Sequence, residues 1–550
     1  MIKTGQQKAI KELLTSDIKS RADLMRVKRV IAKKYSIDIL QNSEILKSLD
    51  KKSNFDLQKI LRKRSVRTMS GIAPVAVLTK PFACPGKCAY CPTEKDVPQS
   101  YLSNEPAVMR AIRCGYDPYK QTQMRLQSLE NNGHEPTKIE LIVIGGTWSV
   151  LPEEYKYWYI ANCFAAANNY KSQIISKIQN PKSKISSKTS LKKLKEILQV
   201  EQNKNEKAKY KLIGVTLETR PDYINEKELL EMRELGCTRV ELGVQAIDDK
   251  ILEKNLRGHG VKAIADASKL LRDFGFKVTY HLMPGLPGAT AVKDLKMFKQ
   301  LFSDERFQPD QIKFYPTVVT RGSLLYKWWK AEEYKPYSDK VLQQLIIDCK
   351  KSVPEYLRII RLIRDIPGES IIAGNVITNL RQVMQQRGVE CRCIRCREAK
   401  EEKVKSYMLK VTRYNASGGE EYFIQACSKD EKILFGFCRL RLGNLTPLNP
   451  PLSGGQLKAP LIKGVGGFIH GGMNNAAMLR ELHVYGELVS VGKSKKVQHA
   501  GLGKVLMAEA EKIAKKNKFE KISVISGVGA RGYYRKLGYK LKETYMMKNL

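Results

Sequence analysis

Six short apolar segments alternate with helical patterns between residues 75 and 315, and this alternation limits the possible folds more than any other feature. Two of the helical patterns, residues 226–235 and 261–274, end at a glycine. Repeated strand–helix units form a parallel sheet whose active site gathers at the carboxyl ends of the strands. The sequence therefore predicts an α/β protein built on a partial (β/α)6 barrel, open on one side for a large substrate. The candidate strands are residues 75–79, 139–144, 212–217, 239–243, 277–282 and 311–315.

Three cysteines follow the first candidate strand, in the run Cys84-Pro-Gly-Lys-Cys88-Ala-Tyr-Cys91. Thiolates at C-x3-C-x2-C spacing can bind three irons of a 4Fe-4S cluster and leave the fourth iron without a protein ligand, whereas four-cysteine sites close every iron. The alternatives are a structural zinc knuckle and three unrelated thiols. We interpret Cys84, Cys88 and Cys91 as the ligands of an iron–sulfur cluster that binds a substrate.

This cysteine loop resembles that of the radical S-adenosylmethionine (SAM) enzymes. In that family SAM binds the free iron through its amino and carboxylate groups, and electron transfer cleaves it to a 5'-deoxyadenosyl radical. The candidate SAM contacts follow later strands: Gly145 and Gly146 would admit the amino-acid moiety, Glu218 would accept hydrogen bonds from ribose, and Gln245 lies at the same edge. Glycines after a strand are also common in plain turns.

The charge balance points to a polyanionic partner. The chain has 97 Lys and Arg against 56 Asp and Glu, a formal charge of +41, and residues 1–80 have 19 against 7. Such an excess attracts nucleic acid, and the helical patterns in residues 1–70 predict a phosphate-binding lobe that ends in the basic residues Arg62, Lys63, Arg64 and Arg67. A solvated basic face without a ligand is the alternative.

The cysteine usage and the absence of long apolar runs predict a cytoplasmic protein without a membrane segment. Six of the 12 cysteines form two tight triads, and the rest are scattered as ordinary small apolar residues. The second triad, Cys391, Cys393 and Cys396, has C-x-C-x2-C spacing. Zinc with a fourth ligand from elsewhere is the favoured occupant, ahead of a second iron–sulfur cluster or no metal.

Two segments interrupt the pattern. Residues 171–211 contain 12 Lys and 3 Glu and predict a flexible or partly helical insertion in the barrel. Residues 443–472 are rich in Gly and Pro and predict a surface loop.

After this loop, a strand at residues 479–486 is followed by Gln498-His-Ala-Gly-Leu-Gly503, which opens the helix 504–515. A glycine turn at a helix N-terminus presents free backbone N–H groups to a pyrophosphate. The Q-x-x-G-x-G run, the next strand at 521–525 and the segment 529–539 resemble, in this order, the GNAT acetyltransferases, which bind acetyl-CoA there.

The combination of both halves resembles the catalytic subunit of the Elongator complex and its stand-alone prokaryotic relatives. Membership implies a tRNA carboxymethyluridine synthase, an acyltransferase that modifies carbon five of the wobble uridine with acetyl-CoA and SAM. The anticodon arm would bind the basic lobe. The resemblance extends from Arg62 to Leu550 and rests on residues 67–71, 105–113, 116–119, 218–222, 481–486 and 526–529.

The same resemblance assigns the acetyl-CoA site. Tyr534 would protonate the leaving thiolate, and Lys138 would reach the ligand from the barrel. This chemistry leads us to expect the cluster and the thioester close together. The contacts implied are Lys138, Glu481, Leu482, His483, Val484, Gln498, Gly501, Leu502, Gly503, Lys504, Tyr533 and Tyr534.

Departures from the family pattern are the short x3 spacing of the cysteine loop, Thr93-Glu94 where many relatives have Gly-Gly, and the two expanded segments. Two other functions stay open: a protein lysine acetyltransferase with a structural cluster, and a non-enzymatic RNA-binding scaffold. The predicted domains are residues 1–70 (basic lobe), 71–365 (barrel), 366–410 (linker with the second triad) and 411–550 (acetyltransferase).

Overall fold

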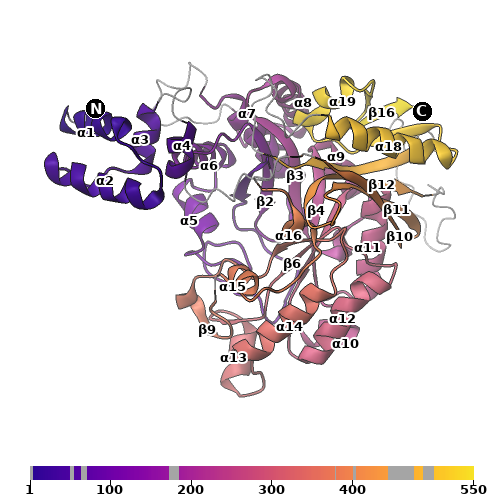
Figure 1. The fold of residues 1–550 in the computed structure, drawn as a ribbon. Coiled ribbons are helices and arrows are strands. Elements are labelled where there is room, and N and C mark those ends of the chain that lie inside the picture. Colours follow the sequence, from indigo (N-terminus) through magenta and orange to yellow (C-terminus); the bar gives the residue numbers. More distant parts are fainter. Residues whose placement is uncertain are drawn as a thin grey trace, which may run out of the picture.

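The computed structural model describes residues 4–49, 55–62, 71–171, 185–377, 379–400, 404, 406–443, 476–486 and 501–550. These residues form a helical N-terminal lobe, a parallel sheet of seven strands and a second seven-stranded sheet near the C-terminus (Figure 1). No helix among them is both long and apolar enough to cross a lipid bilayer. The α/β fold class predicted from the sequence is confirmed.

The N-terminal lobe lies at the left of Figure 1, in indigo, and consists of α1 (Thr4–Thr15), α2 (Arg21–Lys34), α3 (Asn42–Ser48) and α4 (Phe55–Leu61). Helix α2 begins after Ser20, whose side-chain oxygen accepts a hydrogen bond from the backbone N–H of Asp23. Arg62 Nε donates to the carbonyl of Gly133 at 3.2 Å and so ties the lobe to the body. The lobe has its own apolar core, which includes Leu13, Leu24, Ile31, Ile45 and Leu57.

The parallel sheet contains all six strands expected from the sequence. Neighbouring strands pair in parallel throughout, in the order β1-β2-β3-β4-β5-β6-β8, and form the curled sheet of a partial barrel. The strands are β1 (Ala73–Leu78), β2 (Lys138–Ile144), β3 (Lys211–Thr219), β4 (Cys237–Gln245), β5 (Lys277–Leu282), β6 (Gln311–Phe314) and β8 (Arg358–Arg361).

The seventh strand, β8, was not predicted. Its four residues, Arg358-Ile-Ile-Arg361, are too few to show a strand pattern, and two of them are charged. Arg358 pairs with Glu398 at 2.8 Å and donates to the Tyr485 hydroxyl at 2.7 Å, so its charge is satisfied only in the folded chain. A small separate sheet pairs β7 (Val319–Thr320) with β9 (Ile371–Ala373).

Helices connect these strands and cover the outside of the sheet (Figure 1). Gly236 and Gly275 follow helices as predicted, with φ of +83° and +85°, a backbone region that favours glycine. The described part of the 171–211 segment forms helix α8. The helices are α5 (Pro106–Arg113), α6 (Pro118–Asn131), α7 (Glu153–Asn168), α8 (Leu191–Lys207), α9 (Glu226–Glu234), α10 (Asp249–Lys254), α11 (Val261–Asp273), α12 (Ala291–Ser303), α13 (Leu324–Lys330), α14 (Asp339–Lys351), α15 (Leu380–Gln386) and α16 (Ile394–Arg397).

The second sheet is antiparallel except for one parallel pair, β13 with β14, and has the order β10-β11-β12-β13-β14-β16-β15. Helix α18 (Leu502–Lys516) buries Leu506, Met507 and Ala510 against it. Most of the predicted 443–472 loop lies outside the described residues. The elements are β10 (Met408–Ala416), β11 (Gly419–Cys427), β12 (Leu434–Leu442), β13 (Ala476–Val484), β14 (Lys521–Val524), α19 (Arg531–Arg535), β15 (Lys540–Lys542) and β16 (Tyr545–Asn549).

The C-terminal sheet packs against the end of the barrel at which the parallel strands begin. Arg480 Nη2 donates to the carbonyl of Phe276, just before β5, at 2.7 Å. Gly527 lies so close to the start of β3 that a Cβ on it would stand 2.0 Å from the Ile213 carbonyl oxygen. The carboxyl ends of the strands therefore lie at the opposite end of the barrel, away from this domain.

A cluster of buried charges joins the two sheets. Asp310, just before β6, accepts from Arg480 Nη1 at 3.1 Å, and Arg480 also contacts Glu421 at 3.0 Å. Arg272 lies 3.7 Å from Asp310 and 3.4 Å from Glu421, and Arg439 lies 3.6 Å from Asp310. All five side chains are almost fully buried. Burial alone would raise the pKa of Asp310, but the three guanidinium groups hold it well below its usual range.

Candidate active sites at the two ends of the barrel

The cysteine loop lies at the carboxyl end of the barrel, directly after β1. Two backbone hydrogen bonds fix its position: Ala89 N–H donates to the Asn255 carbonyl at 3.1 Å, and Leu325 N–H donates to the Ala89 carbonyl at 2.7 Å. The thiols of Cys84, Cys88 and Cys91 are half-buried. They thus lie at the end of the sheet where parallel-sheet enzymes place their active sites.

The donor set of this loop fits a cluster better than a single ion. Among the described residues, only Cys391, Cys393 and Cys396 gather ligand atoms within 4.8 Å of one another, as ligands around one ion do. The thiols of the N-terminal loop are not gathered so tightly, and three thiolates on one loop are the donor set of a 4Fe-4S cluster with one open iron. Burial raises the pKa of the Cys91 thiol to about 12. A bound metal would reverse this, because a coordinating thiol is deprotonated.

Two arginines lie against the loop. Arg257 Nη1 donates to Cys88 Sγ at 3.0 Å, and Arg220 Nη2 donates to the Arg257 carbonyl at 2.6 Å. Arg220 Nη1 is buried without a partner among the described residues, and Gly86 is so close that a Cβ on it would lie 2.4 Å away. These residues line a cavity of about 640 Å³. Arg220 is paired with Asp222 at 2.8 Å, so the Arg257 guanidinium beside Cys88 is the charge that favours a cluster with a net negative charge.

Replacing Arg257 by methionine is therefore expected to lower the reduction potential of the reconstituted cluster by tens of millivolts. The loss of a positive charge and of a hydrogen bond to sulfur disfavours the more negative, reduced state. The measurement is a redox titration followed by electron paramagnetic resonance. Lys250→Met, an exposed change on α10, is the matched control and should leave the midpoint unchanged. Equal midpoints for wild type and Arg257→Met would contradict this expectation.

The candidate SAM contacts all lie at the same end, but their surroundings differ. Gly145 has φ +135°, and a Cβ there would stand 2.1 Å from Thr79 Oγ1, so packing against β1 already requires glycine. Gly146 has φ +103° and more space, since only the Gln99 carbonyl oxygen lies near, at 3.9 Å. Gln245 ends β4 with φ +69°, and its Oε1 is buried without a partner among the described residues.

Glu218 is held by two side chains that the sequence reasoning did not assign. Tyr101 OH donates to Glu218 Oε2 at 2.8 Å, and His281 Nδ1 lies 3.3 Å from Glu218 Oε1. The only signal in the sequence was the position of His281 at the end of a predicted strand. Glu218 therefore has a fixed orientation at the barrel mouth.

A row of buried charged side chains continues from Glu218 into the barrel. His281 Nε2 lies 2.9 Å from Glu241, which also pairs with Lys313. Burial would raise the pKa of Glu241, but Lys313 and His281 hold it well below its usual range. Arg239 Nη2 contacts Glu140 at 3.1 Å deeper in the barrel. The lumen is therefore polar along its length and carries both signs of charge.

The acetyltransferase half has an opening between two strands. Strand β13 pairs with β14 only from Ala476 to Leu479 but stays paired with β12 as far as Val484. On the edge away from β12, the β13 backbone of residues 481–484 therefore has no strand partner among the described residues. Helix α18 begins beside it at Gly501, which has φ +87°, and its first N–H groups have no partner within the helix. Both features suit acetyl-CoA, one for the pantetheine chain and one for the pyrophosphate.

The other expected acetyl-CoA contacts lie around this opening. Tyr534 is buried, and burial raises its pKa, with smaller contributions from Tyr533, Cys438 and Glu481. A Cβ on Gly503 would stand 2.5 Å from the Tyr533 hydroxyl, so α18 and Tyr533 are in close contact. Leu482, Val484, Leu502 and Lys504 lie on the same two elements, and Gln498 lies outside the described residues.

Two of the expected contacts have other roles in the structure. Glu481 accepts from Arg439 Nε at 2.9 Å and lies 3.5 Å from Lys277 Nζ. Burial opposes its ionisation, but these cations lower its pKa to about 2. The His483 ring packs with Phe437 and Tyr485, with its centroid 5.9 Å and 4.4 Å from theirs, and burial lowers its pKa to about 4. The Glu481 carboxylate is therefore engaged by Arg439 and Lys277.

Lys138 begins β2 at the amino end of the barrel. It makes no hydrogen bond or ion pair with the part of the chain that is described, and burial lowers its pKa. The cysteine loop and the acetyltransferase opening therefore lie at opposite ends of the same strands. The nine residues of β3 separate these ends by roughly 25 Å. The expectation that cluster and thioester lie close together is wrong.

The second triad lies near β8, at the start of α16. The Cys393 side chain is fully buried, and Lys350 Nζ donates to Cys396 Sγ at 3.6 Å. Hydrogen bonds from the other two thiols lower the pKa of Cys393 well below its usual range. No fourth His, Cys, Asp or Glu ligand joins the three within the residues described. The arrangement can hold one ion and leaves its fourth ligand open.

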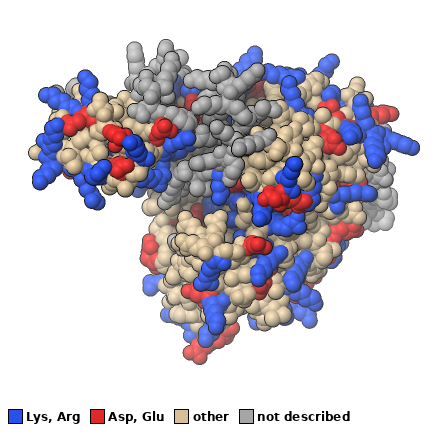
Figure 2. Space-filling model, in the orientation of Figure 1, with Lys and Arg blue, Asp and Glu red and all other residues tan. Residues whose placement is uncertain are grey.

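The basic residues expected to bind RNA are only partly visible. Arg62 is half-buried at the end of α4, and Lys63, Arg64 and Arg67 lie outside the described residues. Lys and Arg side chains project from the helices of the lobe and from the face of the body shown in Figure 2.

Comparison with known proteins gives three matching families. Residues 80–301 match the radical SAM superfamily, residues 309–388 match the radical SAM C-terminal domain, and residues 394–539 match the acetyltransferase (GNAT) family.

Full-length relatives show the same combination. The chain is 41% identical to the tRNA uridine(34) acetyltransferase of Dehalococcoides mccartyi over 89% of this chain and 100% of that protein. It is 37% identical to human Elongator complex protein 3, over 98% and 96%. The solved structure of the archaeal Methanocaldococcus infernus Elp3 with an N-terminal deletion matches with a TM-score of 0.67 at 36% identity, over 87% and 99%.

Proposed function

Because the chain belongs to the family of the tRNA uridine(34) acetyltransferases and Elongator complex protein 3, we propose that it modifies uridine 34 of tRNA with acetyl-CoA and SAM. The product is a carboxymethyl group on carbon five of the base. The observation that supports this best is that one chain combines a cluster-type cysteine loop at the mouth of a polar barrel with a coenzyme opening at its other end. The enzyme acts in the cytoplasm.

At the mouth, Cys84, Cys88 and Cys91 would hold a 4Fe-4S cluster. With SAM, this cluster would supply the radical chemistry that uracil C5 requires, because uracil C5 is a poor nucleophile towards a thioester. Glu218 and Gln245 orient SAM, Glu218 through its fixed contacts with Tyr101 and His281. The wobble base enters from the open side, since loops of RNA can splay a base out of its stack.

At the other end, backbone N–H groups on the open edge of β13 bind the thioester carbonyl and the first turn of α18 binds the pyrophosphate. Tyr534 keeps its proton at neutral pH because burial raises its pKa, so it can protonate the leaving thiolate. Since the two ends are roughly 25 Å apart, water must hydrolyse the thioester at this end, with CoA leaving as the thiol. The resulting acetate must then move along the strands before the carbon–carbon bond forms. The cations Lys277, Arg239 and Lys313 lie along that direction.

The N-terminal lobe binds the anticodon arm through its phosphates, with Arg62 and the basic residues that follow it. The second triad holds a structural zinc ion, with Cys391, Cys393 and Cys396 as three of its ligands. A ligand set so close to β8 stabilises the edge of the barrel next to the acetyltransferase domain.

The direct test is anaerobic incubation of the reconstituted protein with unmodified tRNA, SAM and acetyl-CoA, followed by mass analysis of the nucleosides. A carboxymethylated uridine that depends on all three substrates is the expected product. Acetylated lysine on a protein substrate, formed in air without SAM, would instead support a protein acetyltransferase. Binding of tRNA with no product would support a non-enzymatic scaffold.

Replacing Tyr534 by phenylalanine is expected to slow release of CoA from acetyl-CoA by about 10²- to 10⁴-fold, because the leaving thiolate loses its proton donor. The hydroxyl is the only group removed, so acetyl-CoA binding should change little. Release is measured with a thiol reagent, and binding by calorimetry. The exposed Tyr407→Phe is the matched control and should behave as wild type. Unchanged CoA release by Tyr534→Phe would exclude this role.

A further inference from the structure

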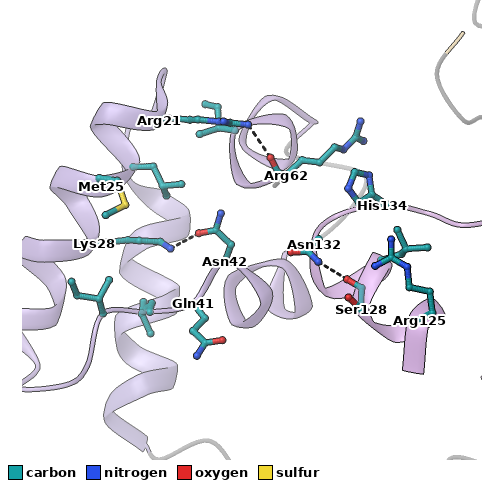
Figure 3. A pocket seen from close by; sticks show the side chains of 15 residues that line it. Arg21, Met25, Lys28, Gln41, Asn42, Arg62, Arg125, Ser128, Asn132 and His134 are labelled. Atoms are coloured by element: carbon teal, nitrogen blue, oxygen red, sulfur yellow. Dashed lines mark hydrogen bonds between the residues drawn. The ribbon is translucent and has the colours of Figure 1, made fainter. Parts of the chain in front are cut away.

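A cavity of about 730 Å³ lies between the N-terminal lobe and the body, and we call it the lobe pocket. Figure 3 shows Lys28 and Asn42 of the lobe on one side of it and Arg125 and His134 of the body on the other. Its volume falls in the range of small-ligand sites. Neither the proposed cluster site nor the coenzyme opening includes it.

Hydrogen bonds preform the walls of the lobe pocket. Arg21 Nη2 donates to the Arg62 carbonyl at 3.0 Å, and Asn42 Nδ2 donates to the Leu61 carbonyl at 2.7 Å. Asn132 Nδ2 donates to the Ser128 carbonyl at 2.7 Å. Lobe and body therefore present their polar groups to one another across a defined space.

The charge of the lobe pocket has one sign. Among the residues that the structure describes, its lining includes Arg21, Lys28, Arg62 and Arg125 and contains no Asp or Glu. The ligand chemistry that fits is anionic, and phosphate is the anion that planar guanidinium groups bind best.

The lobe pocket also has an apolar surface that a simple anion does not need. Met25 and Ile39 line it, and these residues are 44% and 50% exposed. Leu24 and Leu40 also line it and are buried. Exposed large apolar side chains beside cations suit a ligand with a flat apolar face and a negative charge. Asn42 and Asn132 each have a second amide N–H beyond the hydrogen bond described above, which can reach the edge of such a ring.

We propose that the lobe pocket takes one unpaired nucleotide of the RNA substrate, with the base against Met25 and Ile39 and its phosphate on Arg21 and Arg125. This inference rests on the proposed function, because it assumes that RNA is the substrate. It adds that the lobe recognises unstacked RNA, where phosphate contacts alone would bind duplex and single strand alike.

The test compares Arg125→Glu and Met25→Asp in the full chain. The probe is a labelled single-stranded oligouridylate of about ten nucleotides, and binding is followed by fluorescence anisotropy. Both variants should weaken binding at least tenfold, because they place a carboxylate against the phosphate or the base. Lys33→Glu is the matched control: it is exposed on α2, makes the same charge change as Arg125→Glu and lies outside the lining. It should weaken binding by only about twofold.

Two further probes, duplex RNA of equal charge and polyglutamate, distinguish a nucleotide pocket from non-specific binding to a basic surface. Duplex binding should fall equally in Arg125→Glu and Lys33→Glu, and polyglutamate should displace the single strand poorly. An Arg125→Glu loss no larger than that of Lys33→Glu, or displacement by polyglutamate as effective as by RNA, would overturn the proposal. If wild-type protein modified no uridine, but Arg125→Glu still weakened single-strand binding more than Lys33→Glu, the proposed function would be overturned and the pocket would be retained.

Discussion

Replacement of Cys88 by alanine is expected to abolish formation of 5'-deoxyadenosine from SAM and to leave acetyl-CoA binding unchanged. Two remaining thiols on the loop cannot hold a cube with one open iron. The coenzyme opening lies at the other end of the barrel and shares no residue with the loop. The product is measured by mass spectrometry after anaerobic reduction, together with iron content and calorimetry with acetyl-CoA.

Cys114→Ala provides the control for this loss. Cys114 is buried after α5 and lies outside the loop, so its variant should retain the iron content and SAM cleavage of wild type. A Cys88→Ala protein that still formed 5'-deoxyadenosine would show that Cys84-to-Cys91 is not the cluster loop. A variant that lost acetyl-CoA binding as well would show that the two ends depend on one another for their folding.

Replacement of Asp310 by asparagine is expected to lower the free energy of unfolding by about 3–5 kcal/mol, because three buried guanidinium groups would lose one of their two carboxylates. Scanning calorimetry and urea unfolding should both show the loss. Asp266→Asn, which breaks the exposed pair with Lys262 on α11, should cost less than about 1 kcal/mol. Equal unfolding curves for Asp310→Asn and wild type would mean that the cluster contributes no stability.

The same charges predict the effect of acid on stability. The pKa values of Asp310 and Glu481 are depressed in the folded chain, that of Glu481 from 4.5 to about 2. A depressed pKa stabilises the fold above the pKa of the unfolded chain and stops doing so as the pH falls through the folded pKa. Wild-type stability should therefore fall as the pH drops from about 4.5 to about 2, and Asp310→Asn should show a shallower fall.

The sequence predicted the parts of this protein that depend on local pattern. A signature within a few residues marks the cysteine loop, strands β1 to β6 and the helix that begins near Gly501. For the site residues, the structure shows where each one lies, but the catalytic and binding roles assigned to them from the sequence stay predictions. Gly145 illustrates the difference, because its contact with Thr79 accounts for the glycine without any ligand.

The missed features all depend on partners far away in the chain. Glu241 and Lys313 lie 72 residues apart and read as charged interruptions of apolar strands. Only curling of the sheet brings them together in the lumen, and only docking of the second sheet pairs Arg480 with Asp310, 170 residues away. The separation of the two sites was missed for the same reason. Motifs reveal which chemistry is present, but not which end of a strand it occupies.

The buried charges between the two sheets also limit how this protein can be divided. A fragment that begins near residue 411 would expose Arg439, Arg480 and Glu421 on a face shaped for the barrel, and a barrel fragment would keep Arg272 and Asp310 without their partners. Neither fragment would reproduce the native surface around the coenzyme. Truncation studies of either half therefore report on a damaged protein, and assignments of activity require point variants in the intact chain.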